Sequence, residues 1–167
     1  MSPNAADMKR LWAPWRSSFL AKGPQRACFF CAAARAGRRR DRVHHVVARG
    51  KHVFGILNLY PYNNGHLIIA PYRHTGRFEK LQAPEWTEML ALSQQLMRRL
   101  TRSLHPHGFN LGFNLGRTAG AGVPGHLHLH IVPRWNGDTN FMPVLAGTKV
   151  ISQSMEQVYQ LLTKEKG

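Results

Sequence analysis

The chain has 167 residues, with 23 lysine and arginine residues against 8 aspartate and glutamate residues, and a formal net charge of +15. This length suits one domain with a buried core, a 43% hydrophobic content excludes a disordered chain, and no apolar run approaches the roughly 20 residues that cross a bilayer. Residues 1–16 lack the apolar stretch of a secretory signal, so we expect a cytoplasmic protein, and the basic excess favours nucleotides, polyphosphates or nucleic acid as partners.

The chain begins with an irregular arm, predicted over residues 1–27, and continues as a single domain over residues 28–167. Cys28 and Cys31 open this domain as a Cys-x-x-Cys pair. In a chain without a secretory signal, such a pair is typical of a metal site or a redox centre rather than of a structural disulfide. One pair alone is a weak signal and needs further ligands.

The basic residues gather in residues 35–51 and again in Arg98, Arg99 and Arg102. Aromatic side chains are not interleaved with them, as they are in platforms that bind single-stranded nucleic acid. We interpret the arginines at 38–40 as solvated surface.

Short segments rich in valine, isoleucine and leucine predict strands over residues 44–48, 52–58 and 66–70. The proline, asparagine and glycine residues of 60–65 predict a turn between the second and third of these strands. An antiparallel hairpin is therefore expected here.

Residues 84–104 predict the one long helix, because Pro84 suits a first helical position and apolar residues recur at helical spacing. A strand over 109–115, a glycine-rich loop and a last helix over 153–163 complete the order. Strands and helices in this order predict an α+β fold with a mainly antiparallel sheet.

Three histidines, His126, His128 and His130, alternate with aliphatic residues. Strict alternation predicts a strand that turns the aliphatic side chains to the core and the imidazoles to the opposite, solvent-facing side. Such a row of imidazoles offers nucleophiles, proton carriers and metal ligands in a fixed geometry.

Two further segments match known motifs but lack the structural context that the motifs require. Residues 120–125 fit G-x-G-x-x-G, but a dinucleotide fold needs a helix to follow, and a strand pattern follows instead. The glycines still allow backbone N–H groups to approach a phosphate. His105 and His107 lie just beyond a helix end, and we assign them no catalytic role.

The segment from His126 to Arg134 resembles the histidine-triad motif, His-φ-His-φ-His-φ-φ with φ apolar. The chain is similar to the histidine triad (HIT) superfamily of nucleotide hydrolases and transferases, within the branch of the fragile histidine triad enzyme and the bacterial diadenosine tetraphosphate phosphorylases. The residues that support this branch are Asn58, Pro61, Gly65, His66, Pro71, Arg73, Arg77, Phe78, Leu81 and 133–144. The resemblance spans residues 50–145 and implies a HIT-like α+β fold with a mainly antiparallel five-stranded sheet, two helices and a homodimer.

The resemblance also implies roles for the histidines. His128 would attack the α-phosphorus of a dinucleoside polyphosphate such as diadenosine tri- or tetraphosphate, forming a covalent nucleotidyl-histidine that water or phosphate then releases. His130 and His66 would contact phosphate oxygens, and the backbone carbonyl of His126 would fix the tautomer of the nucleophile.

The remaining substrate contacts implied by the resemblance are polar or glycine positions. Asn58 would bind the ribose, while Asn114, Gly116 and the loop with Gly120 and Gly122 would lie along the phosphates. Ordinary hydrogen bonding within turns is the alternative for both asparagines. Many members carry Gln and Ser or Thr shortly before the triad. At these positions this chain has Gly122 and Val123, which lack polar side chains, so the choice between hydrolase and phosphorylase stays open.

Several members of the family bind zinc, and the corresponding residues here are Cys28, Cys31, His74 and His126. Two cysteines with two histidines form a closed structural zinc set. The alternative is a reduced Cys-x-x-Cys pair with His74 exposed.

Two rival functions remain. One is a zinc hydrolase in which His126, His128 and His130 bind the metal, although neighbouring positions on one strand do not easily reach one ion. The other is a zinc-containing module without catalysis that binds nucleic acid through its arginines. A nucleotide-cleaving enzyme without a membrane partner is the reading we favour.

Overall fold

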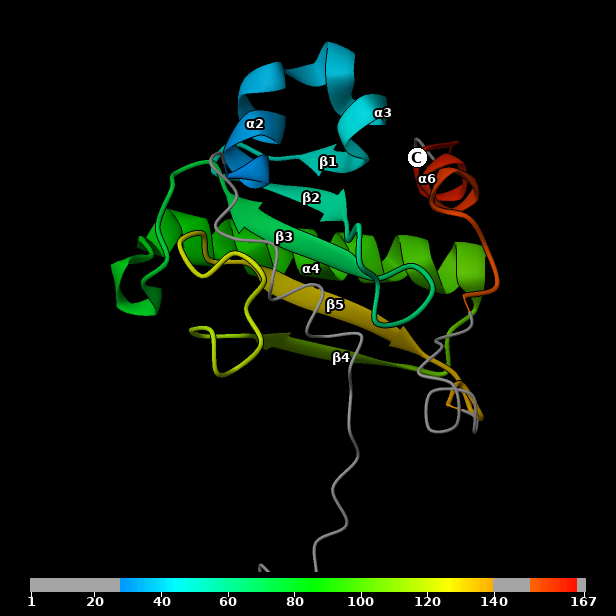
Figure 1. Ribbon diagram of the computed structural model, residues 1–167. Helices are drawn as coiled ribbons and strands as arrows, with labels where there is room; N and C mark the ends of the chain where they lie inside the picture. Colours follow the sequence, from blue (N-terminus) through cyan, green and yellow to red (C-terminus); the bar gives the residue numbers. More distant parts are fainter. Residues whose placement is uncertain (1–27, 140–150, 165–167) are drawn as a thin grey trace, which may run out of the picture. The chain divides into compact units, whose positions relative to one another are not determined.

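A five-stranded antiparallel sheet organises the part of the chain that the computed structural model describes, residues 28–139 and 151–164 (Figure 1). Its strand order is β1-β2-β3-β5-β4, and every neighbouring pair is antiparallel. The strands are β1 (Val46–Arg49), β2 (Val53–Leu57), β3 (Leu67–Pro71), β4 (Gly108–Phe113) and β5 (Leu129–Arg134). The α+β prediction with a mainly antiparallel sheet is confirmed.

The long helix α4 (Ala83–Leu104) covers one face of the sheet (Figure 1). Its N-terminus is closed by a capping box, in which the Glu85 carboxylate accepts the backbone N–H of Gln82 at 2.8 Å. Its buried stripe packs against the inward side chains of the sheet, which forms the main core of the described residues. This stripe consists of Met89, Leu92, Leu96 and Leu100. Burial of this stripe is the largest stabilising contribution that the helix makes.

The helix α2 (Phe29–Ala36) lies on the opposite face, where its Phe30 and Ala33 pack on β1, β2 and β3 in a second buried cluster. The prediction of two helices is wrong, because the described residues hold four α-helices. They are α2 (Phe29–Ala36), α3 (Asp41–His44), α4 and α6 (Met155–Lys164), with 3₁₀ turns η2 (Arg38–Arg40) and η3 (Phe78–Lys80). The helices α2 and α3 span only eight and four residues, too short for a clear helical period.

The strand with the histidines is also shorter than predicted. It begins at Leu129, so His126, which lies in a bend, and His128 both precede β5. The ladder with β3 ends because Pro71 has no N–H to donate, and the N–H of Leu127 bonds the carbonyl of Thr75 instead, at 2.6 Å.

The predicted arm over residues 1–27 and the similarity at residues 140–144 lie outside the described residues. Residues 28–138 and 151–164 belong to one unit of internal contacts. No helix of these described ranges combines the length and the apolar character needed to cross a membrane.

Candidate active site

The four histidines of the predicted site are buried, with side chains between 0% and 7% exposed. The prediction that the triad faces solvent is therefore wrong. Phe30 of α2 covers two of the rings, with its centroid 5.0 Å from those of both His126 and His128. The Tyr62 ring lies over His130, at 5.5 Å and an angle of 22°. A hydrophobic layer above the sheet thus replaces water around the imidazoles.

One ring nitrogen of His128 has a fixed role. Its Nδ1 lies 2.7 Å from the backbone carbonyl oxygen of His126. Because a carbonyl oxygen only accepts, Nδ1 must carry the proton, and the lone pair of the neutral ring is on Nε2. Burial lowers the pKa of His128 below its usual value, so the neutral form dominates at neutral pH.

A chain of hydrogen bonds fixes the tautomers of His66 and His130. The backbone N–H of Tyr62 donates to His66 Nδ1 at 2.9 Å, so the proton of that ring is on Nε2. This Nε2–H donates in turn to His130 Nδ1 at 2.9 Å, which places the proton of His130 on its own Nε2. Burial is the main cause that lowers the pKa of His66 to about 3 and that of His130 to about 4, so both rings stay neutral.

This series of hydrogen bonds ends at the Nε2–H of His130. His130 Nε2 is buried and has no hydrogen-bond partner among the residues that the structure describes. Buried polar atoms without a partner are uncommon, and each one calls for an explanation. An anionic oxygen of a bound ligand would satisfy this N–H.

Tyr62 is a residue of this site that the sequence reasoning missed. Besides its backbone bond to His66 and its ring contact with His130, its hydroxyl accepts a hydrogen bond from Asn114 Nδ2 at 3.1 Å. Asn58 approaches the same nitrogen of His66 as the Tyr62 N–H, with its Nδ2 3.2 Å from His66 Nδ1. The signal that could have found Tyr62 is its place in the predicted turn, four residues before a candidate catalytic histidine.

The glycines of the predicted phosphate loop lie between β4 and the histidine segment, half-exposed or exposed. Gly116 and Gly120 have φ values of 81° and 90°, which suit glycine. The far end of the loop packs against the segment that follows β3, since a Cβ at Gly76 would collide with the carbonyl oxygen of Pro124. Gly122 is exposed on the same loop.

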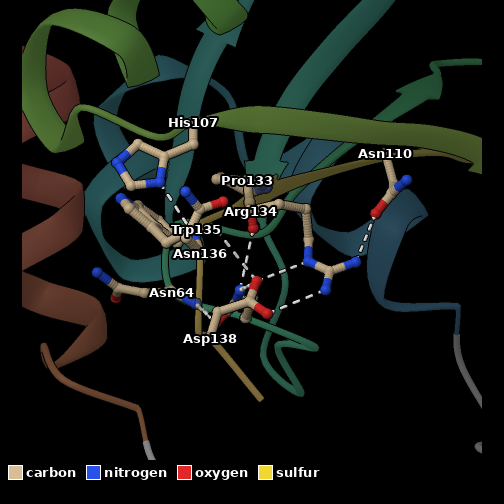
Figure 2. Close-up of polar contacts among 9 residues, drawn as sticks. Asn64, His107, Asn110, Pro133, Arg134, Trp135, Asn136 and Asp138 are labelled. Carbon is tan, nitrogen blue, oxygen red and sulfur yellow. Dashed lines mark hydrogen bonds and ion pairs between the residues drawn. The ribbon is translucent and has the colours of Figure 1, made fainter.

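A polar network fixes the far end of β5, four residues beyond His130 (Figure 2). Arg134 pairs with Asp138 through two nitrogens, at 2.6 and 2.9 Å, and reaches Asn110 at 2.8 Å. The buried Asn63 donates both to the carbonyl of Pro133 and to Asp138. Because Asn63 belongs to the turn before β3, this network ties that turn to the end of β5.

A cluster that could hold a metal ion lies at the start of the histidine segment. It consists of Cys28, Cys31, His74 and His126, whose ligand atoms all lie within 4.8 Å of one another. His126 Nε2 donates to the carbonyl of Pro71 at 2.8 Å, so the lone pair on Nδ1 points at the cluster. The prediction that these four residues come together is matched by the geometry.

The distances from His126 Nδ1 to the other three ligand atoms are close to those of tetrahedral zinc coordination. Nδ1 of His126 lies 3.3 Å from Sγ of Cys28, 3.6 Å from Sγ of Cys31 and 3.2 Å from Nδ1 of His74. Ligands at the Zn–N and Zn–S bond lengths would be about 3.3–3.8 Å apart around a tetrahedral Zn²⁺. Among the described residues this is the group able to share an ion, and His128 and His130 are not part of it.

Comparisons with known proteins agree with one another. A family model described as "HIT domain" matches residues 39–137. The AP-4-A phosphorylase of Mycobacterium tuberculosis (strain CDC 1551 / Oshkosh) is 42% identical over 164 residues, which cover 95% of this chain and 84% of that protein. The crystal structure of a Zn-bound histidine triad family protein from Mycobacterium smegmatis is 28% identical, has a TM-score of 0.66 and matches over 83% of this chain and 91% of that one. A hypothetical histidine triad nucleotide-binding protein from Sulfolobus tokodaii has the same fold, with 24% identity, a TM-score of 0.64 and coverage of 82% and 90%.

Proposed function

This chain belongs to the HIT domain family, and from that premise we propose that it is an enzyme that cleaves dinucleoside polyphosphates at an α-phosphate. The substrate class is supported by the mycobacterial relative, which is named an AP-4-A phosphorylase and aligns with nearly the whole chain. Diadenosine tri- and tetraphosphate are the substrates to test.

His128 is the proposed nucleophile. Its Nε2 lone pair forms a bond to the α-phosphorus while the bridging P–O bond breaks, and the departing nucleotide keeps the electron pair. The support is the 2.7 Å bond from His128 Nδ1 to the carbonyl of His126, which holds the proton on the far side of the ring.

His130 and His66 are proposed to stabilise the charge on the phosphate. The observation that carries the proposal is the series of hydrogen bonds that runs from Tyr62 through His66 to His130, whose buried Nε2–H has no partner within the described part of the chain. A preorganised donor of this kind is worth most where negative charge develops in a dry site. Asn58 is proposed to bind the ribose, and Asn114 with the loop of Gly116, Gly120 and Gly122 to lie along the phosphates.

Inorganic phosphate is the proposed acceptor in the second step, because the mycobacterial relative is named a phosphorylase. The phosphate oxygen attacks the α-phosphorus, the N–P bond to His128 breaks, and the ring recovers its lone pair. From diadenosine tetraphosphate this route gives ADP and ATP, whereas attack by water would give AMP and ATP. Product identity therefore separates a phosphorylase from a hydrolase.

The test is turnover of both substrates with and without phosphate, with products separated by chromatography. His128→Ala should reduce turnover to below about a thousandth, as is usual when a nucleophile is removed. His105→Asn is the matched control, because His105 closes α4 in a left-handed conformation that asparagine tolerates. Mass spectrometry of quenched enzyme should find one nucleoside monophosphate on the peptide with His128, and wild-type rates in His128→Ala would overturn the assignment.

We further propose that Cys28, Cys31, His74 and His126 bind a structural Zn²⁺. The donor set and its spacing support this, as does the Zn-bound mycobacterial structure. The ion would join the start of α2 to the histidine segment and hold His126, whose carbonyl orients His128. It takes no part in the bond changes proposed above.

Metal analysis of the purified protein tests this proposal. We expect one zinc per chain in wild type, loss of zinc from Cys28→Ser/Cys31→Ser, and a lower melting temperature of that variant. Zinc that stays in the double variant and is lost only from His128→Ala would support the three-histidine hydrolase instead. RNA binding with a steep salt dependence and no nucleotide turnover would support the nucleic-acid module. A homodimer and a cytoplasmic location stay predictions, for which light scattering and cell fractionation are the measurements.

A further inference from the structure

The two cysteines of the chain lie one helical turn apart at the start of α2. Cys28 is extended and precedes the helix directly, and Cys31 is the third residue of the helix. The carbonyl of Cys28 accepts the N–H of Ala32 at 3.0 Å, which closes the first turn and leaves both cysteine side chains on the same side. The sequence holds no third cysteine, so within one chain these two thiols can pair only with each other.

The two sulfur atoms are close enough to be joined by a small movement. Both Sγ atoms belong to the cluster whose ligand atoms all lie within 4.8 Å of one another. Positions three residues apart on a helix have Cβ atoms about 5–6 Å apart, and a disulfide needs about 3.5–4.5 Å. Because Cys28 lies outside the helix, rotation at this residue can close the difference without unwinding α2. The Cys-x-x-Cys spacing is also that of disulfide oxidoreductases.

A small oxidant can reach this pair from solvent. Both cysteines are half-buried free thiols, and His74, whose Nδ1 lies 3.3 Å from Sγ of Cys31, is exposed. His126, the fourth member of the cluster, is fully buried. The cluster therefore has an open side at His74 and an inner side at His126. Its sulfur atoms are the groups that an oxidant attacks, because thiolates react with peroxides far more readily than imidazoles do.

Two contacts couple the cysteine pair to the histidine site. Phe30 directly precedes Cys31, and its ring centroid lies 5.0 Å from those of His126 and His128. His126 presents its ring Nδ1 to Sγ of Cys28 at 3.3 Å, while its carbonyl oxygen holds Nδ1 of His128 at 2.7 Å. A disulfide would draw both sulfurs away from this ring and leave no thiolate to bind a metal ion. A change at the sulfurs therefore reaches His128 through Phe30 and through His126.

We propose that Cys28 and Cys31 are a redox site, at which hydrogen peroxide joins them in a disulfide that displaces His126 and lowers turnover at His128. The inference rests on the nucleotide cleavage and the zinc site proposed above. First, one sulfur bonds to a peroxide oxygen while the O–O bond breaks, and hydroxide leaves with the electron pair. The second sulfur then bonds to the first, the S–O bond breaks and the oxygen leaves as water. The sulfurs give up two electrons, the two thiol protons complete two water molecules, and an external dithiol reverses the reaction.

The test treats the full chain with hydrogen peroxide and measures free thiols, intact mass, zinc content and cleavage of diadenosine tetraphosphate. We expect both thiols to be lost, the mass to fall by two hydrogen atoms and zinc to pass to a coloured chelator. Turnover should fall about tenfold or more, because a displacement of about 1 Å at a reacting group costs up to about a hundredfold. Dithiothreitol followed by Zn²⁺ should restore it. The imidazole NMR signals of His126 and His128 should shift on oxidation, a readout that needs no substrate.

Cys31→Ser is the control for the mass measurement, because its one remaining thiol should gain oxygen or link two chains instead of losing hydrogen. Three results would overturn the proposal: both thiols intact in treated wild type, a disulfide that leaves the imidazole signals unchanged, or a loss of turnover that dithiothreitol and Zn²⁺ do not reverse. An untreated chain that holds no zinc or cleaves no dinucleoside polyphosphate would refute the earlier proposals instead. The thiol count, the mass and the imidazole signals would still decide whether the redox site exists.

Discussion

Replacing His66 with leucine removes the middle of the chain Tyr62–His66–His130, and we expect the variant to lose both stability and turnover. The imidazole is 1% exposed, accepts from the Tyr62 N–H at 2.9 Å and donates to His130 Nδ1 at 2.9 Å. Leucine fills part of the space but pairs with neither group. Each unsatisfied buried polar group costs about 1–3 kcal/mol, so the free energy of unfolding should fall by about 2–6 kcal/mol.

Turnover should fall because His130 loses the donor that fixes its tautomer. Its proton can then move to Nδ1, and the Nε2–H no longer always faces the phosphate. Loss of one preorganised donor corresponds to about a tenfold or larger drop in kcat. His66→Gln is the matched variant, because its amide can accept from Tyr62 and donate to His130, and it should keep more of both properties.

Urea unfolding at neutral pH and initial rates on diadenosine tetraphosphate measure these effects. The order expected in both assays is wild type, then His66→Gln, then His66→Leu. A leucine variant that unfolds at the same urea concentration as wild type would show that the two hydrogen bonds of His66 do not hold the site together. Equal kcat values in the glutamine and leucine variants would refute the role given to the tautomer.

Three further predictions concern pH, a turn and a ring. The pKa of His66 is about 3 in the folded chain and near 6.5 in the unfolded chain. The neutral ring therefore contributes fully to the stability of the fold above pH 6.5, and the free energy of unfolding falls by about 2 kcal/mol as the pH drops from 6.5 to 5. Urea unfolding across this range should show a smaller pH dependence in His66→Gln than in wild type, and equal slopes would contradict this sign. Glu88→Gln should lower the free energy of unfolding by about 1–2 kcal/mol, because one amide oxygen replaces two charged acceptors of backbone N–H groups; an unchanged melting curve would count against it. Tyr62→Phe should change kcat by no more than about threefold, whereas Tyr62→Ala, which removes the ring over His130, should lower kcat by about tenfold; similar rates in the two variants would exclude a role for the ring.

The parts of the fold with long, regular patterns could be predicted from sequence. The helix expected at 84–104 is Ala83–Leu104, and the strands expected at 52–58 and 66–70 are Val53–Leu57 and Leu67–Pro71. In these elements the same side chains that set the period also form the core. The helix α2 was not predicted, because it is stabilised by the packing of Phe30 and Ala33 on the sheet. A pattern of eight residues is too short to indicate such a tertiary contact.

Within the site, residues with distinctive chemistry could be named in advance, but their surroundings could not. The two cysteines, His74 and His126 were expected together from the resemblance, and their ligand atoms do converge. Phe30 and Tyr62 were not expected near the histidines, because aromatic residues in a loop or a short helix look the same whether they cover a site or a core. Phe30 lies inside the Cys-x-x-Cys pair, so a ligand set that joins this pair to His126 already implies an aromatic ring above the triad.

Burial changes what the imidazoles can do. A protonated imidazole has no free lone pair, and a solvent-facing histidine with its ordinary pKa near 6.5 would share its ring nitrogens with water. Burial, to which the Phe30 and Tyr62 rings contribute, lowers the pKa of His128 and of His130, so His128 keeps a lone pair and His130 a desolvated N–H. A lone pair and a donor on neighbouring rings, 4.8 Å apart between centroids, are the two groups that displacement at a phosphorus requires. The hydrophobic cover is therefore part of the chemistry, because a row of wet imidazoles would hold neither group ready.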